Sequence, residues 1–302
     1  MEVLGRLLGL LVLLLVGTGL RFSGALDERR TQLLNTLAYY VALPALIFVS
    51  TYDQAIGELL TGELLVGLLA AVFGTVGVAW LIHRGAEERG RRSVAIIQSY
   101  HSNLGYLGLP LVAATFDARV TAIASVVLGV VSLTQVPLTI VILTAINEAD
   151  ASIGEEVRRL ARNPVLATLI AGLTIGSLGL PVPGPVTAGL DVLGTLALPI
   201  ALLCVGASLQ VDLPSVDVVS TGAVVAVKIV CMPLFGWIAL SLLEVDAATF
   251  TASIVMLGTP TAVSTYVFAS ELGGDEEFAS LNVFLTTLAS IATLFVLIRA
   301  VG

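Results

Sequence analysis

The sequence predicts an all-α polytopic membrane protein with ten transmembrane helices, arranged as two inverted repeats of five helices. Three observations lead to this fold class: the composition, the length of the apolar runs, and a constant offset between the two halves. Of the 302 residues, 57% are hydrophobic and 12% are charged, and the mean hydropathy is +1.02. Average chains carry about 25% charged residues. The apolar runs are continuous rather than alternating, which favours membrane helices over barrel strands.

Ten apolar runs are candidates to cross a bilayer as helices. They lie at residues 3–20, 31–52, 60–83, 93–115, 119–146, 164–180, 189–209, 217–243, 248–270 and 278–299. The first run also resembles a cleaved signal peptide, because Arg6 precedes it and Ser23-Gly-Ala25 resembles a cleavage site. We expect it to be a true span, because a later run corresponds to it.

An offset of 155 residues relates the first five runs to the last five. It places Ala42-Leu-Pro44 on Ala197-Leu-Pro199, and we expect both prolines to kink supporting helices. An odd number of spans inverts the second copy, which is typical of secondary transporters. The division is a first repeat at 1–146, a linker at 147–163 and a second repeat at 164–302. The short, charged linker predicts an interfacial helix; the alternative is a regulatory domain.

The fourth and ninth runs are interrupted at corresponding places. Gly105, Gly108 and Pro110 weaken a helix in the fourth run, and Gly258-Thr259-Pro260 does so in the ninth. The second interruption predicts a half-helix whose threonine is the N-cap and whose proline is the first helical residue. A second half-helix, running the opposite way, is expected to start after Gly105. Helix starts carry partial positive charge and free N–H groups, which favour a bound carboxylate.

Lys228 is the exception to a charge-free membrane core, because it lies about midway along the eighth run. A cation there costs at least about 2.5–3.5 kcal/mol, and such groups normally have a partner or a function. Two interpretations stay open: Lys228 is neutral or bonded to the freed carbonyls of a broken helix, or it attracts an anion. The acidic residues lie at span ends or in loops, at Asp53, Glu63, Asp117, Asp191, Asp217, Glu244, Asp246, Glu271 and Asp275.

Asn103 brings a polar amide into the first interruption. It is a candidate substrate ligand. The alternative is that its amide hydrogen-bonds to the backbone carbonyls that the break leaves without a partner. Other polar or interrupting residues near the two breaks are predicted substrate contacts, with packing or local hydrogen bonding as the alternative. The full predicted set is Gln98, His101, Asn103, Gly105, Tyr106, Gln135, Lys228, Gly258, Thr259, Pro260, Thr261 and Ser264. Gln135 could instead serve a carbonyl that neighbouring Pro137 frees.

The arginines predict the orientation. With the N-terminus outside, the cytoplasmic loops hold Arg21, Arg29, Arg30, Arg84, Arg89, Arg91, Arg92, Arg158, Arg159 and Arg162, while the outside keeps Arg6, Arg119 and Arg299. We therefore expect a plasma-membrane protein with both termini outside. The net charge is −8, and the acidic loops with arginine in place of lysine indicate a halophilic, archaeal source or a bias towards arginine codons.

Several function classes receive no support from the sequence. His83 and His101 are the two histidines, and no nucleophile–base constellation, metal-spaced cluster or phosphate-binding loop is present. We therefore expect no enzyme, no cofactor and no metal. The lack of a basic surface argues against nucleic acid. A non-transporting receptor would need a sensing domain, and no loop is long enough to form one.

Three motifs resemble the auxin efflux carrier family, which includes the plant PIN-FORMED carriers and microbial organic-acid permeases. Asn103-Leu-Gly-Tyr-Leu-Gly-Leu-Pro110 is similar to the Asn-x6-Pro pattern of that family's fourth span. Lys228-Ile-Val-Cys-Met-Pro233 is similar to its basic residue followed by proline. Pro260 with Val267-Phe-Ala269 and Glu271 is similar to its ninth span.

The resemblance covers essentially the whole chain and implies a ten-helix inverted repeat. It also implies a dimerising scaffold of spans 1, 2, 6 and 7 and a transport domain of spans 3–5 and 8–10. Spans 4 and 9 would cross at the substrate site. The plant carriers have a proline where this chain has Ser102, so we expect a looser first crossover and do not assume indole-acid specificity. Their long cytoplasmic loop, and its phosphorylation control, are absent here.

The leading hypothesis is a transporter of small organic anions, auxin-like or other mono- and dicarboxylates. It would act as a homodimer by elevator-type alternating access, with the anion held where spans 4 and 9 cross. The alternative is a sodium- or proton-coupled symporter or exchanger on a related inverted-repeat fold. Exchangers of that kind usually need a membrane-embedded carboxylate, and every Asp and Glu of this chain lies at a span end or in a loop.

Overall fold

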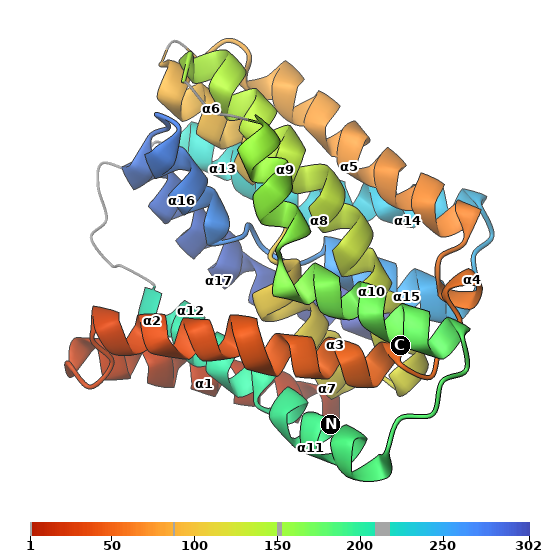
Figure 1. Cartoon of the computed structure of the whole chain (residues 1–302). Helices are drawn as coiled ribbons and strands as arrows, with labels where there is room; N and C mark the ends of the chain where they lie inside the picture. The colour runs from red at the N-terminus through yellow and green to blue at the C-terminus, as the bar shows by residue number, and fades with distance from the viewer. Residues whose placement is uncertain (1, 87, 150–152, 209–217) are drawn as a thin grey trace. The chain divides into compact units, whose positions relative to one another are not determined.

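The computed structural model of the chain describes residues 2–86, 88–149, 153–208 and 218–302. Helices make up 82% of the structure, and no strand occurs among these residues. Residues 150–152 of the predicted linker lie outside the described part of the chain, and so do residues 209–217, which join the seventh and eighth predicted runs and include Asp217. Within the described residues, each of the ten predicted apolar runs coincides with one helix or with two or three successive helices (Figure 1).

Six helices in the described ranges are long and apolar enough to cross a membrane. They are Glu28–Thr51, Gly62–His83, Ala118–Asn147, Gly184–Ala207, Val219–Leu242 and Glu276–Val301. Four shorter apolar helices accompany them, at Val12–Phe22, Leu104–Thr115, Pro164–Ser177 and Ala247–Leu257. The chain is therefore an integral membrane protein, while the number of ten spans and their inversion stay predictions.

The chain divides into two compact units, each built from separate stretches of sequence. Unit 1 contains Met1–Thr61, Gly105–Gly129 and Leu160–Leu209. Unit 2 contains Gly62–Leu104, Val130–Arg159 and Gln210–Gly302. The long helix α8 (Ala118–Asn147) contributes residues to both units. The linker contains a short helix, α9 (Ile153–Ala161).

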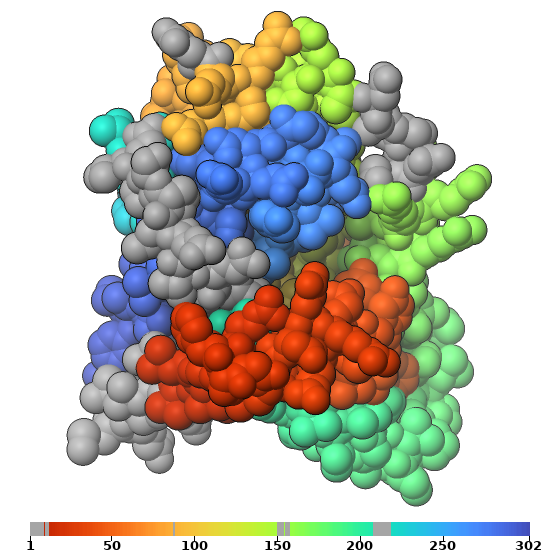
Figure 2. Space-filling model, turned by 90° about the vertical axis from the view of Figure 1, so that its left-hand side faces the viewer, coloured from red at the N-terminus to blue at the C-terminus, as the bar shows by residue number. Residues whose placement is uncertain are grey.

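Unit 1 is built from helix pairs that pack through glycines. Helix α1 (Glu2–Phe22) lies along α12 (Ala197–Ser208), and α3 (Leu43–Thr51) packs on α10 (Pro164–Ser177) and α11 (Gly184–Thr195) (Figure 1). In Figure 2 the red N-terminal helices form much of the visible face of this unit, beside the green-blue α11. Helices α2 (Glu28–Leu37), α4 (Ile56–Leu59) and α7 (Leu109–Thr115) complete it.

The glycines of these pairs allow close backbone approach. A Cβ added to Gly17 would lie 2.3 Å from the Leu203 carbonyl oxygen, and one added to Gly172 would lie 2.1 Å from the Thr51 hydroxyl. Gly17 and Gly172 are separated by 155 residues, the offset that the sequence predicts for its repeats, and each lies against the helix of the other repeat's second run.

We expect Gly17→Ala to destabilise the protein by about 1–3 kcal/mol, because the new methyl group meets the backbone of α12 and forces the helices apart. The matched control is Gly19→Ala in the same helix, where an added Cβ meets nothing within 4 Å. Alanine there is expected to stabilise by about 0.5–1 kcal/mol. Thermal unfolding in detergent checks both; equal midpoints for the two variants would contradict the close packing of α1 on α12.

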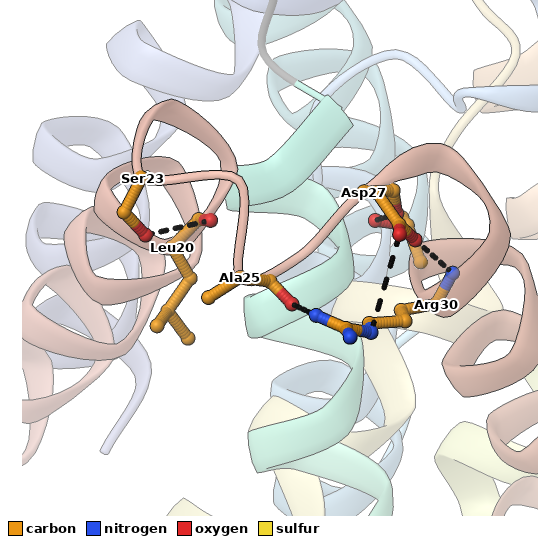
Figure 3. Close-up of polar contacts among 6 residues, drawn as sticks. Leu20, Ser23, Ala25, Asp27 and Arg30 are labelled. Carbon is orange, nitrogen blue, oxygen red and sulfur yellow. Dashed lines mark hydrogen bonds and ion pairs between the residues drawn. The ribbon is translucent and has the colours of Figure 1, made fainter.

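The turn between α1 and α2 is held by local hydrogen bonds (Figure 3). Asp27 caps α2 by accepting from the backbone N–H of Arg30 at 2.8 Å, and the Arg30 guanidinium donates to the Ala25 carbonyl at 2.7 Å. Gly24 has φ +75°, a backbone conformation that favours glycine. The Arg30–Asp27 ion pair is exposed, so it adds little to stability.

Unit 2 carries the interruptions of both runs, although the fourth run from Gly105 onwards belongs to unit 1. Helix α5 (Gly62–His83) packs on α14 (Met232–Leu242), and α15 (Ala247–Leu257) packs on α14 and α17 (Glu276–Val301). Helices α6 (Arg89–Gln98), α13 (Val218–Ala226) and α16 (Ser264–Glu271) complete the unit. Ion pairs Arg91–Asp275, Arg159–Glu271 and Arg89–Glu148 link its loops and helix ends.

Three π-helices each end two residues before a proline. They are η1 (Ala38–Ala42), η2 (Leu104–Gly108) and η3 (Val227–Cys231), and Pro44, Pro110 and Pro233 follow. A proline lacks the backbone donor and clashes with the carbonyl four residues earlier; the wider π turn relieves that clash. Pro44 therefore follows a π turn, and Pro199 lies in the first turn of α12, just after the run divides at Leu196.

Candidate functional site

The two interrupted runs meet through their backbones. Ser102 and Thr261 form an isolated antiparallel β-bridge. On one side of it the Asn103 N–H donates to the Pro260 carbonyl at 2.8 Å, and on the other the Ala262 N–H donates to the His101 carbonyl at 3.0 Å. The crossing of the fourth and ninth runs that the family resemblance implies is therefore present. The extended segments satisfy each other's polar groups, which a membrane interior requires.

The half-helices begin at different residues from those predicted. The second begins at Ser264, with Val263 as its N-cap and no side-chain cap, so the prediction that Thr259 caps it with Pro260 as first helical residue is wrong. The Thr259 hydroxyl instead donates to the Met256 carbonyl at 2.7 Å. Residues 260–262 stay extended because they pair with residues 101–103, and this pairing overrides the local capping signal.

The first break also lies earlier than predicted. Helix α6 ends at Gln98, and the helical path resumes with η2 at Leu104. Gly105 therefore lies inside this helix, and the predicted start after Gly105 is wrong. The π turn accommodates Pro110, so the interruption falls at residues 99–103 instead.

Gln135, from α8, clamps the first extended segment. Its side-chain oxygen accepts from the Ser102 N–H at 2.9 Å, and its side-chain nitrogen donates to the Ser102 carbonyl at 3.1 Å. A proline at residue 102 could not make the first of these bonds. Gln135 therefore binds both backbone polar groups of Ser102. This differs from the looser crossover that we expected because Ser102 replaces the proline of the plant carriers. Gln135 serves Ser102 rather than a carbonyl freed by Pro137.

Gln98 ties the end of α6 to α16 and α17. Its side-chain nitrogen donates to the Thr265 hydroxyl at 3.0 Å and to the Ala279 carbonyl at 2.9 Å, and its side-chain oxygen accepts from Asn282 at 2.9 Å. The Gln98 backbone carbonyl accepts from the Thr261 hydroxyl at 2.6 Å. The amide of Gln98 is therefore fully used within the protein.

Lys228 lies in η3 and is fully buried, at 0% exposure. Its ammonium donates to the Leu257 carbonyl, the last residue of α15, at 3.1 Å, and contacts the Met232 sulfur at 3.4 Å. A helix C-terminus carries a partial negative charge, which stabilises a cation. The geometry fits the interpretation that Lys228 binds a carbonyl freed by a broken helix, and the ammonium has a third N–H to offer.

The Asn103 amide is differently placed from those of Gln98 and Gln135. Its residue is 3% exposed, and its side chain makes no hydrogen bond within the described residues. Because Asn103 directly follows the bridge, this amide lies at the crossover as a donor and acceptor that no described residue uses. The backbone pairing with residues 260–262, and not the Asn103 amide, supplies hydrogen-bond partners for the polar groups at the break.

The other predicted site residues divide between the two units. Tyr106 packs on a unit 1 cluster of Ala38, Ile200 and Cys204, and Gly105 belongs to the same unit. In unit 2, Gly258 is the C-cap of α15. An added Cβ there would meet the Leu297 side chain. Ser264 is exposed.

Sequence reasoning missed several polar residues at the crossover. Thr286 accepts from the Thr261 N–H at 3.3 Å, and Thr139 contacts His101. Asn282 lies fully buried beside Gln98. An asparagine inside the tenth apolar run was a usable signal, since such an amide needs a partner at membrane depth. The threonines gave no signal, because a threonine in a membrane helix commonly bonds to its own backbone.

Three relatives of this chain are described as transporters. A protein of Rhizobium meliloti described as "Putative malonate transporter" is 28% identical over 293 residues, covering 91% of this chain and 90% of that protein. An uncharacterized transporter of Methanothermobacter thermautotrophicus is 25% identical over 292 residues, covering 95% and 94%. One of Methanocaldococcus jannaschii is 23% identical over 290 residues, covering 93% of each.

A family profile described as "Membrane transport protein" matches residues 2–298. The match spans nearly the whole chain, both interrupted runs included, and confirms the resemblance read from Asn103–Pro110, Lys228–Pro233 and the ninth run. The chain belongs to this membrane transport family, the auxin efflux carriers.

Proposed function

We propose that the protein carries small organic anions across the membrane by alternating access. The observation that carries this proposal is the hydrogen-bonded crossing of residues 101–103 with 260–262, because irregular backbone at membrane depth marks the substrate site of secondary transporters. The R. meliloti relative described as a malonate transporter supports a carboxylate as the substrate class.

The proposed anion site in unit 2 combines three groups of positive or donor character. They are the Lys228 ammonium, the free amide of Asn103 and the start of α16, which lacks a side-chain cap. Gly105, Tyr106 and the remaining predicted contacts stay proposals. The buried polar side chains of the described residues include no Asp or Glu, so a cation exchanger that relies on a buried carboxylate receives no support.

The proposed mechanism is an elevator in which a transport domain moves against a dimeric scaffold. We assign spans 1, 2, 6 and 7 to the scaffold and spans 3–5 and 8–10 to transport. The separate compactness of units 1 and 2 supports two bodies, although residues 105–129 group with unit 1. The packing of α1 with α12 and of α3 with α10, pairs related by the offset, supports the inverted repeat.

A thermal-shift screen tests the substrate class. Purified protein is heated with acetate, propionate, malonate, succinate, malate or indole-3-acetate, with choline chloride as a control of equal ionic strength. We expect at least one carboxylate to raise the unfolding midpoint, since a ligand at 100 times its Kd stabilises by about 2.7 kcal/mol. Uptake of that carboxylate into proteoliposomes then shows transport. A panel without any shift or uptake would refute an organic-anion carrier.

A further inference from the structure

His101 is built into the crossover itself. Its backbone carbonyl accepts from the Ala262 N–H, next to the bridge, and its side chain is 2% exposed. The imidazole ring lies against the ring of Phe268, with 5.9 Å between centroids. Any change in the charge of this ring therefore occurs where the two interrupted runs cross.

Among the described residues, one ring nitrogen of His101 has a hydrogen-bond partner and the other has none. Nδ1 lies 2.8 Å from the Thr139 hydroxyl oxygen, which in turn lies 2.9 Å from the Tyr100 hydroxyl. A threonine hydroxyl both donates and accepts, so this contact suits a neutral or a protonated ring. Within the described residues, Nε2 makes no hydrogen bond. A protonated imidazole donates from both nitrogens, and its second N–H needs an acceptor that these residues do not supply.

The groups around His101 favour protonation of its imidazole ring only when an anion is bound nearby. Lys228, from η3, lies near this segment, because its side-chain nitrogen and the Ser102 hydroxyl both contact the Met232 sulfur, at 3.4 and 3.5 Å; Tyr100 is the titratable neighbour on its own segment. Thr139 of α8 and Phe268 of α16 carry no charge. None of the buried residues described is an Asp or Glu. A second buried cation beside Lys228 would be costly alone, whereas a bound carboxylate supplies both a counter-charge and an acceptor for Nε2–H.

We propose that His101 binds a proton that is transported together with the anion, which makes the carrier a proton–carboxylate symporter. This proposal rests on the proposed function. The proton passes from water on the loading side to Nε2 as the carboxylate binds, and both leave on the other side. No bond of the substrate forms or breaks. One proton with a monocarboxylate moves no net charge, and one proton with a dicarboxylate moves one negative charge.

The test measures carboxylate affinity against pH. The Kd values of propionate and malonate are measured by calorimetry between pH 5.5 and 8.5 in sodium-free buffer, for wild type, His101→Gln and His83→Gln. The ionisation of the substrate affects all three proteins equally. We expect affinity to rise by up to about tenfold per pH unit as pH falls in wild type and in His83→Gln, the control at the other histidine. The His101→Gln variant should still bind with a flat profile.

A second pair of variants keeps His101 and changes its partner. Thr139→Val leaves the Nδ1–H of the protonated ring without an acceptor, so the pH dependence should move to lower pH, whereas Thr139→Ser should behave as wild type. In proteoliposomes without sodium, an acidic exterior should drive wild-type uptake, and a protonophore should abolish it.

Equal pH slopes in wild type and His101→Gln, or identical profiles for Thr139→Val and Thr139→Ser, would overturn the proton proposal. So would uptake that requires sodium and ignores the pH gradient. These outcomes leave the anion carrier intact if binding persists. A wild-type protein that binds neither propionate nor malonate at any pH would overturn both proposals.

Discussion

Replacing Lys228 with Gln or Ala is expected to abolish anion uptake in proteoliposomes while the protein still inserts and folds. Removing a charged donor from a buried site costs about 1.5–3 kcal/mol of ligand binding, which corresponds to an affinity roughly 10- to 100-fold lower. Among the buried residues that the structure describes, Lys228 is the only Lys or Arg, so no second buried lysine or arginine is present to replace it.

The two substitutions separate the two roles of Lys228. Gln keeps a neutral donor for the Leu257 carbonyl, whereas Ala removes it and leaves that carbonyl and the Met232 sulfur without their partner. We therefore expect Lys228→Ala to lower the unfolding midpoint more than Lys228→Gln, with both losing uptake. Wild-type uptake by Lys228→Gln would limit Lys228 to holding the end of α15 and would remove its electrostatic role.

The sequence located both breaks but misplaced their boundaries. Gly105, Pro110 and Pro260 signalled irregular backbone in the fourth and ninth runs, and irregular backbone is present in both. Local signals did not reveal that the segments pair with each other over 159 positions, as the Ser102–Thr261 bridge does. Long-range backbone pairing decides which residues stay extended, so capping rules applied to Thr259 alone gave the wrong helix start.

The hydrogen-bond partners of the side chains at the site also could not be predicted from the sequence. A lysine and an asparagine in apolar runs are conspicuous in a sequence, because each needs compensation at membrane depth. The sequence does not show which side-chain amides already have hydrogen-bond partners within the protein. Gln98 and Gln135 were predicted as substrate contacts on the same grounds as Asn103, and only the folded structure shows their amides engaged with Thr265, Ala279, Asn282 and Ser102.

Because the amide of Gln98 has partners within the described residues and that of Asn103 has none, we expect substitutions at these two residues to affect binding and stability differently. Asn103→Ala is expected to weaken carboxylate binding by about 10- to 100-fold, because the lost amide would donate to a charged ligand, a bond of about 1.5–3 kcal/mol. Its unfolding midpoint without ligand should change little, since the side chain bonds to no described residue.

Gln98→Ala should show the opposite pattern. It leaves the Ala279 carbonyl and the Asn282 amide buried without their partner, at about 1–3 kcal/mol for each unsatisfied group, so the midpoint should fall clearly while the folded fraction binds carboxylate more nearly as wild type does. Calorimetric Kd values and unfolding midpoints on the same preparations check both variants. Equal losses of affinity, or a larger loss for Gln98→Ala, would mean that the anion approaches the other face of the fourth run and that the free amide of Asn103 is not its ligand.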